Sequence, residues 1–124
     1  MKKLLLALTL LTTLSHQAMA SCDGGEEITG NYNKHVYCVS NTGMNWWSAF
    51  TWCTANGRHL ATQAEACNNR SWGDGYCPNL SLGRSIGVWT AQAIDDNKAY
   101  IFSFINGYVM TRERSDATSR ALCY

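Results

Sequence analysis

The six cysteines are the feature that most constrains the fold of this chain. None of them forms the close Cys-x-x-Cys pair of structural zinc sites, and the histidines are isolated in the sequence, so we expect no metal site. In an oxidising compartment, the default state of cysteines is the disulfide. We therefore expect three disulfides, made by Cys22, Cys38, Cys53, Cys67, Cys77 and Cys123.

The start of the chain predicts that it reaches such a compartment. Lys2 and Lys3 precede an apolar run over residues 4–14, and residues 18–20, Ala-Met-Ala, have the small-x-small pattern of a cleavage site. This order is typical of a secretory signal peptide, here of bacterial form. It predicts a signal peptide over residues 1–20 and a periplasmic or secreted domain over residues 21–124.

A second interpretation of the cleavage region remains open. Residues 19–22, Met-Ala-Ser-Cys, are similar to a bacterial lipobox, in which Cys22 is lipidated after cleavage. Lipidation would leave five cysteines, an odd number that exported proteins usually avoid.

Size and charge exclude several classes of protein. The chain of 124 residues is too short for a two-domain dehydrogenase or a TIM barrel. Its formal charge of +1 becomes −1 when Lys2 and Lys3 leave with the signal peptide, and no Lys/Arg-rich run follows, so we expect no nucleic-acid partner. No later apolar run is long enough for a transmembrane segment. No Gly-x-Ser-x-Gly or phosphate-binding loop occurs, so we expect neither catalysis nor a cofactor.

Local arguments narrow the many possible cysteine pairings without fixing them. The fourth and fifth cysteines flank a polar, Gly-rich loop that a short bridge would clamp. The first two bracket an N-terminal arm, and chain ends fray unless they are tied down. These choices leave the third cysteine, on a predicted helix, to pair with the last, on a predicted strand. The favoured framework is Cys22–Cys38, Cys53–Cys123 and Cys67–Cys77.

Capping residues predict two short helices. The first covers residues 45–56, with Asn45 as N-cap and Gly57 at the position where a left-handed residue ends a helix. The second begins at Thr62, because Thr62 and Glu65 have the spacing of a capping box. The apolar stripe of the first helix, which excludes Trp47 and Trp52, comprises Trp46, Ala49, Phe50 and Cys53.

Strand composition dominates the second half. Residues 99–105 are followed by Asn106-Gly107, which predicts a tight two-residue hairpin turn with a return strand over residues 108–111. Residues 21–34 are polar and Gly-rich, with short apolar interruptions at Ile28 and Tyr32. The other expected strands are 36–39, 88–90 and 121–124. Helices followed by strands predict an α+β fold with two short helices packed on a small antiparallel sheet. The expected core aromatics are Trp46, Phe50, Trp89, Phe102 and Phe104.

The order of these motifs resembles a C-type lectin-like domain. Tyr37-Cys38 is followed by Trp47, Ala49 and Cys53, then by Gly57 and Leu60-Ala61, and family members carry a similar order. The family pairs its helix cysteine with one in the last strand, and its long form adds an N-terminal hairpin bridge. The second half is similar to short bacterial forms related to the formylglycine-generating enzyme fold, through Trp89-Thr90, Ala99-Tyr100, Phe102, Phe104, Asn106-Gly107 and Leu122-Cys123-Tyr124.

The departures from this family bear on function. Its calcium-dependent sugar-binding members carry Glu-Pro-Asn or Gln-Pro-Asp, and later Trp-Asn-Asp, and none of these occurs here. The stretch after Trp89 is also too short for the full calcium-binding loop region. Calcium takes about six to eight oxygen ligands, and Asp95-Asp96 is more typical of a polar turn. The formylglycine-generating activity needs a larger domain with a reactive cysteine pair, so the resemblance implies calcium-independent binding.

Two loops, residues 68–87 and 106–118, form the candidate binding surface. Trp72 is either exposed for a ligand or folded back over the core, and Glu113 and Asp116 are possible partners of the nearby arginines. The expected ligand-binding residues are Trp72, Asp74, Tyr76, Arg84, Asn106, Tyr108, Arg112 and Arg114. They predict an exported module that recognises a glycan or a protein, for example in adhesion. The alternative is a structural or assembly subunit of a surface appendage or secretion complex.

Overall fold

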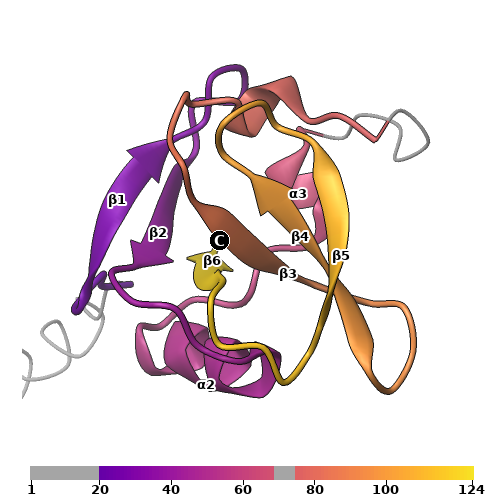
Figure 1. Ribbon diagram of the computed structural model, residues 1–124. Helices are drawn as coiled ribbons and strands as arrows, with labels where there is room; N and C mark the ends of the chain where they lie inside the picture. The colour runs from indigo at the N-terminus through magenta and orange to yellow at the C-terminus, as the bar shows by residue number, and fades with distance from the viewer. Residues whose placement is uncertain (1–19, 69–74) are drawn as a thin grey trace, which may run out of the picture.

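Six strands form one mixed sheet at the centre of the protein. The structure is a computed structural model that describes residues 20–68 and 75–124. The strands are β1 (Gly25–Thr29), β2 (Val36–Ser40), β3 (Gly87–Ala93), β4 (Lys98–Ser103), β5 (Val109–Glu113) and β6 (Arg120–Cys123). Their order in the sheet is β1-β2-β6-β3-β4-β5, so the last strand of the chain lies in the middle of the sheet (Figure 1).

The sheet corrects the expectation of purely antiparallel pairing. Strand β6 is antiparallel to β2 but parallel to β3, with Trp89 opposite Ala121. Only the β4–β5 pair was predicted from a local turn, and a turn determines orientation only for the strands it joins. Strand β6 follows β5 by the longer loop 114–119 and inserts between two strands that are distant in sequence. The α+β class itself is confirmed.

Both predicted helices are present with the predicted caps. Helix α2 covers Trp46–Ala55, and the Asn45 side chain accepts a hydrogen bond of 2.8 Å from the amide of Ser48. Gly57 follows the helix with a φ of +70°. Helix α3 covers Gln63–Ala66, and both hydrogen bonds of the predicted capping box form. A 3-10 helix, η3 (Pro78–Leu80), adds a short turn inside the long irregular segment.

Strand β1 was not predicted. Its sequence, Gly-Glu-Glu-Ile-Thr, has the polar character of a loop, and only Ile28 is buried in the core. It pairs along its length with β2, from Gly25 opposite Ser40 to Thr29 opposite Val36. Strand β1 lies at the edge of the sheet and buries only Ile28. It therefore lacks the alternating apolar pattern by which a strand is predicted from sequence.

The predicted two-residue turn at Asn106-Gly107 is wrong. The backbone amide of Ser103 bonds to the carbonyl of Tyr108, so residues 104–107 form a wider connection between β4 and β5. Phe104 causes the difference, because it is completely buried and its amide bonds to the carbonyl of Ile86. These contacts remove Phe104 from the hairpin pairing. Only Gly107, with a φ of +76°, has the left-handed conformation that a two-residue turn requires of both residues.

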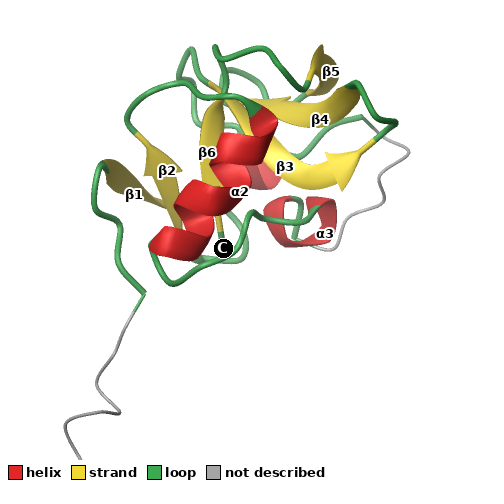
Figure 2. Ribbon diagram, turned by 90° about the horizontal axis from the view of Figure 1, so that it is seen from below, coloured by secondary structure: helices red, strands yellow, loops and turns green. Residues whose placement is uncertain are grey.

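Alternating side chains divide the core between the two faces of the sheet. One face carries Val88, Phe102 and Leu122 and is covered by the irregular segment with α3 and η3. The other carries Trp89 and Ile101 and is covered by α2, which lies across the central strands (Figure 2). The core prediction is confirmed for Trp46, Trp89, Phe102 and Phe104, whereas Phe50 is only partly buried at the edge.

All three disulfides pair as predicted. The Cα–Cα distances are 5.5 Å for Cys22–Cys38, 5.4 Å for Cys53–Cys123 and 4.9 Å for Cys67–Cys77. The first ties the start of the described chain to β2, and the second joins α2 to β6.

In the described parts of the chain, no helix has the length and apolar character needed to span a membrane.

A buried polar hub joins the β1–β2 loop to the η3 segment. The Tyr37 hydroxyl donates to the carbonyl of Glu65 and accepts hydrogen bonds from the side-chain amides of Asn33 at 2.8 Å and Asn79 at 3.1 Å. Tyr37 is completely inaccessible to solvent. Burial raises the pKa of this phenol, although the two amide donors oppose the effect.

This raised pKa predicts a loss of stability in alkaline solution. The folded pKa of Tyr37 lies above its unfolded value of about 10, so its contribution is complete below that pH and is lost as the pH rises through the folded pKa. We expect the unfolding free energy to fall more steeply above pH 10 in the wild type than in Tyr37→Phe. Urea unfolding at pH 8 and near pH 11 measures this difference. The exposed Tyr32→Phe variant is expected to keep the wild-type slope, and equal slopes in all three proteins would contradict the prediction.

Candidate functional site

The predicted binding residues do not form one surface. Trp72 and Asp74 lie outside the described residues. Tyr76, Asn106 and Tyr108 meet where the η3 segment touches the β4–β5 connection. Arg112 and Arg114 lie toward the other end of β5, and at the usual strand rise Arg114 is about 20 Å from Tyr108.

Tyr76 and Tyr108 form an exposed aromatic pair. Their backbones make an isolated bridge, their ring centroids are 5.5 Å apart and the rings are tilted by 51°. Their exposed fractions are 39% and 52%. The ring faces are therefore held in one place while a large part of each side chain remains accessible.

Gly107 allows this pairing. The amide of Cys77 donates to the carbonyl of Gly107 at 2.6 Å, and the amide of Val109 donates to that of Gly75 at 3.0 Å. A Cβ atom on Gly107 would lie 2.4 Å from the carbonyl oxygen of Cys77. Any side chain at this position would therefore separate the two segments and, with them, Tyr76 from Tyr108.

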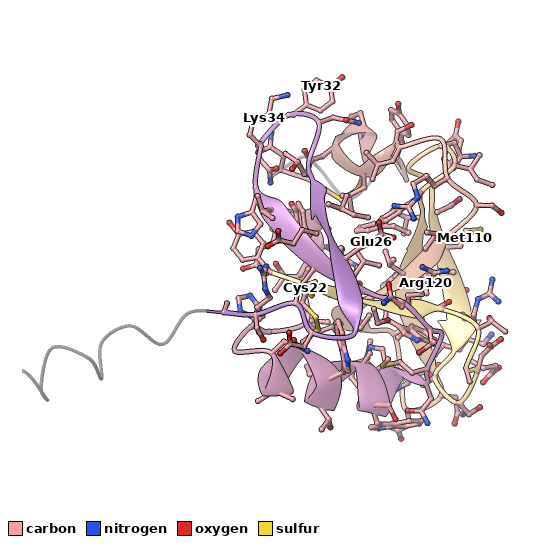
Figure 3. All side chains as sticks on the ribbon, turned by 90° about the vertical axis from the view of Figure 1, so that its left-hand side faces the viewer. Cys22, Glu26, Tyr32, Lys34, Met110 and Arg120 are labelled. Carbon is pink, nitrogen blue, oxygen red and sulfur yellow. A yellow bond between two sulfur atoms is a disulfide. The ribbon has the colours of Figure 1, made fainter. Side chains whose placement is uncertain are left out.

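Polar and apolar groups extend the pair into what we call the tyrosine patch, defined as Tyr76, Asn106, Tyr108 and Met110. The Asn106 side-chain oxygen accepts the amide hydrogen of Tyr108 at 3.0 Å, which leaves its amino group without a hydrogen-bond partner among the described residues. Met110 is 43% exposed and projects from the sheet at β5 (Figure 3). By strand alternation it lies on the same face as Tyr108.

Arg84 is directed away from the tyrosine patch. Its guanidinium lies 2.6 Å from a carboxylate oxygen of Glu26 on β1, and both side chains are partly exposed. The hydrogen bond with Arg84 lowers the pKa of Glu26, and Arg120 of β6 adds a smaller effect. The same pair raises the pKa of Arg84. This arginine therefore links the loop before β3 to the outer strand of the sheet.

Arg112 and Arg114 also have partners within the chain. Arg112 lies 3.5 Å from Asp116 and donates to the Thr118 hydroxyl at 3.0 Å. Arg114 lies over the rings of Trp46, at 4.0 Å from the centroid, and Trp47, at 4.8 Å. Asp116 was predicted as a possible acidic partner of the arginines, and it does pair with Arg112. Arg114 instead makes cation–π contacts with two aromatic rings.

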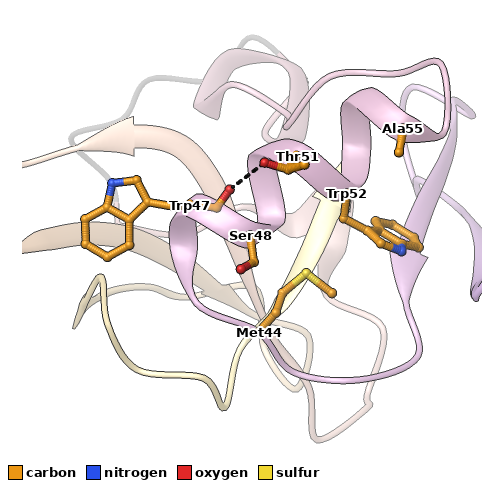
Figure 4. A pocket seen from close by; sticks show the side chains of 6 residues that line it. All are labelled: Met44, Trp47, Ser48, Thr51, Trp52 and Ala55. Atoms are coloured by element: carbon orange, nitrogen blue, oxygen red, sulfur yellow. Dashed lines mark hydrogen bonds between the residues drawn. The ribbon is translucent and has the colours of Figure 1, made fainter.

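Sequence reasoning missed a groove on the outer side of α2. It has a volume of about 540 Å³ and is lined by Met44, Trp47, Ser48, Thr51, Trp52 and Ala55 (Figure 4). The signal for it was present, because Trp47 and Trp52 are both large aromatic residues outside the apolar stripe of the helix. Trp47 is 50% exposed.

No group of three or more His, Cys, Asp or Glu side chains within the described ranges has an arrangement that would hold a metal ion.

Comparisons of the chain with protein-family models and with curated proteins gave no match.

Proposed function

We propose that this protein is an exported binding module with a C-type lectin-like fold, and that its tyrosine patch recognises a glycan without calcium. The observation that carries the proposal is the Tyr76–Tyr108 pair, two half-exposed aromatic rings held at 5.5 Å. Aromatic ring faces stack on the apolar faces of sugar rings, and phenolic hydroxyls both donate and accept hydrogen bonds.

The neighbouring groups favour a sugar over a purely apolar ligand. Neither tyrosine hydroxyl has a hydrogen-bond partner in the described part of the chain, and the same holds for the Asn106 amino group. Sugar hydroxyls need donors and acceptors around an apolar platform, and this patch offers both.

Two disulfides support the proposed family. Cys53–Cys123 joins the first helix to the last strand, and Cys22–Cys38 closes the N-terminal hairpin. Both pairings are those that the resemblance implies. The proposal of calcium independence rests on the sequence, in which none of the family's calcium-binding tripeptides occurs.

A glycan array probed with the exported protein in EDTA tests this function. We expect binding that persists in the chelator, and a Kd about tenfold weaker for Tyr108→Ala, because losing one stacked ring costs about 1.4 kcal/mol. Tyr32→Ala is the matched control, since Figure 3 shows Tyr32 at the tip of the β1–β2 loop, away from Met110. No binding to any glycan on the array, or equal affinity of Tyr108→Ala and wild type, would contradict the proposal.

A further inference from the structure

Ser21 is the first residue after the predicted cleavage site, and it is fixed against the end of helix α2. Its backbone amide donates to the carbonyl of Asn56 at 2.8 Å, and its hydroxyl donates to the side-chain oxygen of Asn56 at 3.0 Å. The Nε atom of Arg58 donates to the Ser21 carbonyl at 3.1 Å. All three polar groups of Ser21 therefore have a partner in the folded domain.

The end of α2 that receives Ser21 has no positive charge of its own. The last carbonyls of a helix have no partner within it and carry a partial negative charge, which favours a nearby cation. Helix α2 has no basic residue in its last turn, and none of its ten residues is charged. Asn56 is its C-cap, so the carbonyl that accepts the Ser21 amide hydrogen belongs to this terminal group. A cation on the Ser21 nitrogen would supply the missing charge.

The two residues after Ser21 keep it at this position. Cys22 is bridged to Cys38 and packs against the core cluster beneath α2. The amide of Asp23 donates to the side-chain oxygen of Asn56 at 2.8 Å. Cleavage before Cys22, as the lipobox interpretation requires, would remove Ser21 with its three hydrogen bonds, and lipidation of Cys22 would remove the bridge. The contacts therefore favour cleavage one residue earlier.

We propose that the protein is processed between Ala20 and Ser21, and that the new α-ammonium group of Ser21 binds the C-terminal end of α2. A peptidase adds one water to the peptide bond, so that Ala20 leaves with a carboxylate and the Ser21 nitrogen becomes an ammonium. The nitrogen that already donates to Asn56 thereby becomes a charged donor, and charge-assisted hydrogen bonds are the stronger kind. This inference rests on export, which is part of the proposed function, and not on the tyrosine patch.

The charged side chains around Ser21 offset one another. The Arg58 guanidinium opposes an ammonium at Ser21, but it also lies 3.8 Å from a carboxylate oxygen of Glu27. Asp23, two residues along the chain, adds a negative charge on the same arm. The carbonyl end of α2 is therefore the decisive influence on the new ammonium group.

Urea unfolding of two synthetic, disulfide-bonded chains tests the docking of the ammonium. Both begin at Ser21, and one carries an acetyl group on the Ser21 nitrogen, which keeps the N–H that bonds to Asn56 but removes the charge. We expect the unfolding equilibrium constant at pH 6.5 to be about fivefold larger for the acetylated chain. A stabilised ammonium has a folded pKa above its unfolded value of about 8, so its contribution is lost as the pH rises through the folded pKa. The difference should therefore shrink to less than about twofold at pH 9.5.

N-terminal sequencing and intact mass of the exported protein test the cleavage position. We expect Ser21 as the first residue and a mass without lipid. A first residue other than Ser21 or a lipidated Cys22 would overturn the proposal. So would equal stability of the two synthetic chains at pH 6.5, or a difference that persists unchanged at pH 9.5. None of these measurements involves a glycan, so their failure and the failure of the proposed glycan recognition are distinguishable.

Discussion

Replacing Cys53 and Cys123 together by alanine is expected to lower the unfolding free energy by about 4 kcal/mol. The bridge spans 70 residues, and a long closed loop restricts the unfolded chain more than a short one. Both cysteines are completely buried, and they connect α2 to the central strand β6. Urea unfolding of the non-reduced protein measures the loss.

The Cys67/Cys77 double alanine variant is the matched comparison. Its bridge spans only 10 residues, so we expect a smaller cost of about 3 kcal/mol by the same chain-entropy relation. The cysteines are equally buried, so lost packing is similar in the two variants. A larger cost for the short bridge would show that the long bridge is not the main constraint on the unfolded chain.

Asn79→Ala is expected to cost about 3 kcal/mol. The Asn79 side chain is completely buried and donates to the Tyr37 hydroxyl and, at 3.0 Å, to the carbonyl of Ala66. Its oxygen accepts the amide hydrogens of Tyr32 and Asn33. Alanine removes the side-chain partner of the Tyr32 and Asn33 amides and of the Ala66 carbonyl, while the Tyr37 hydroxyl keeps its hydrogen bonds to Glu65 and Asn33. Each buried group left without a partner costs about 1–3 kcal/mol before relaxation or water entry.

Asn97→Ala provides the control for this variant. Asn97 is exposed in the β3–β4 turn, so we expect a change within about 0.5 kcal/mol. Urea unfolding of both variants gives the comparison. If Asn79→Ala were as stable as Asn97→Ala, the polar hub would not be what joins the β1–β2 loop to η3.

The fold could be predicted from the sequence wherever the signal was local. The Asn45 cap and the Thr62–Glu65 box are formed by residues within one helical turn, and both appear as predicted. The turn after β4 failed because buried Phe104 bonds to Ile86, a contact that the Asn-Gly pattern does not contain. The parallel pairing of β6 failed for the same reason, because it depends on strands that are distant in sequence.

In the candidate site, too, the residues with a local signal could be predicted, whereas contacts between distant parts of the chain could not. Aromatic and polar residue types in the predicted loops pointed to Tyr76, Asn106 and Tyr108, which do meet. Charge alone could not show that Arg84 pairs with Glu26 or that Arg114 lies over Trp46. Those partners come from other elements and are set by the sheet order.

The most direct measurement of the proposed function is an amide chemical-shift map of the purified, disulfide-bonded, isotope-labelled protein with the best glycan from the array, in EDTA. We expect the largest shifts at Tyr76 and across residues 105–110, and none along α2. Perturbations centred on Trp47 and Trp52, or binding that requires added calcium, would contradict recognition by the tyrosine patch.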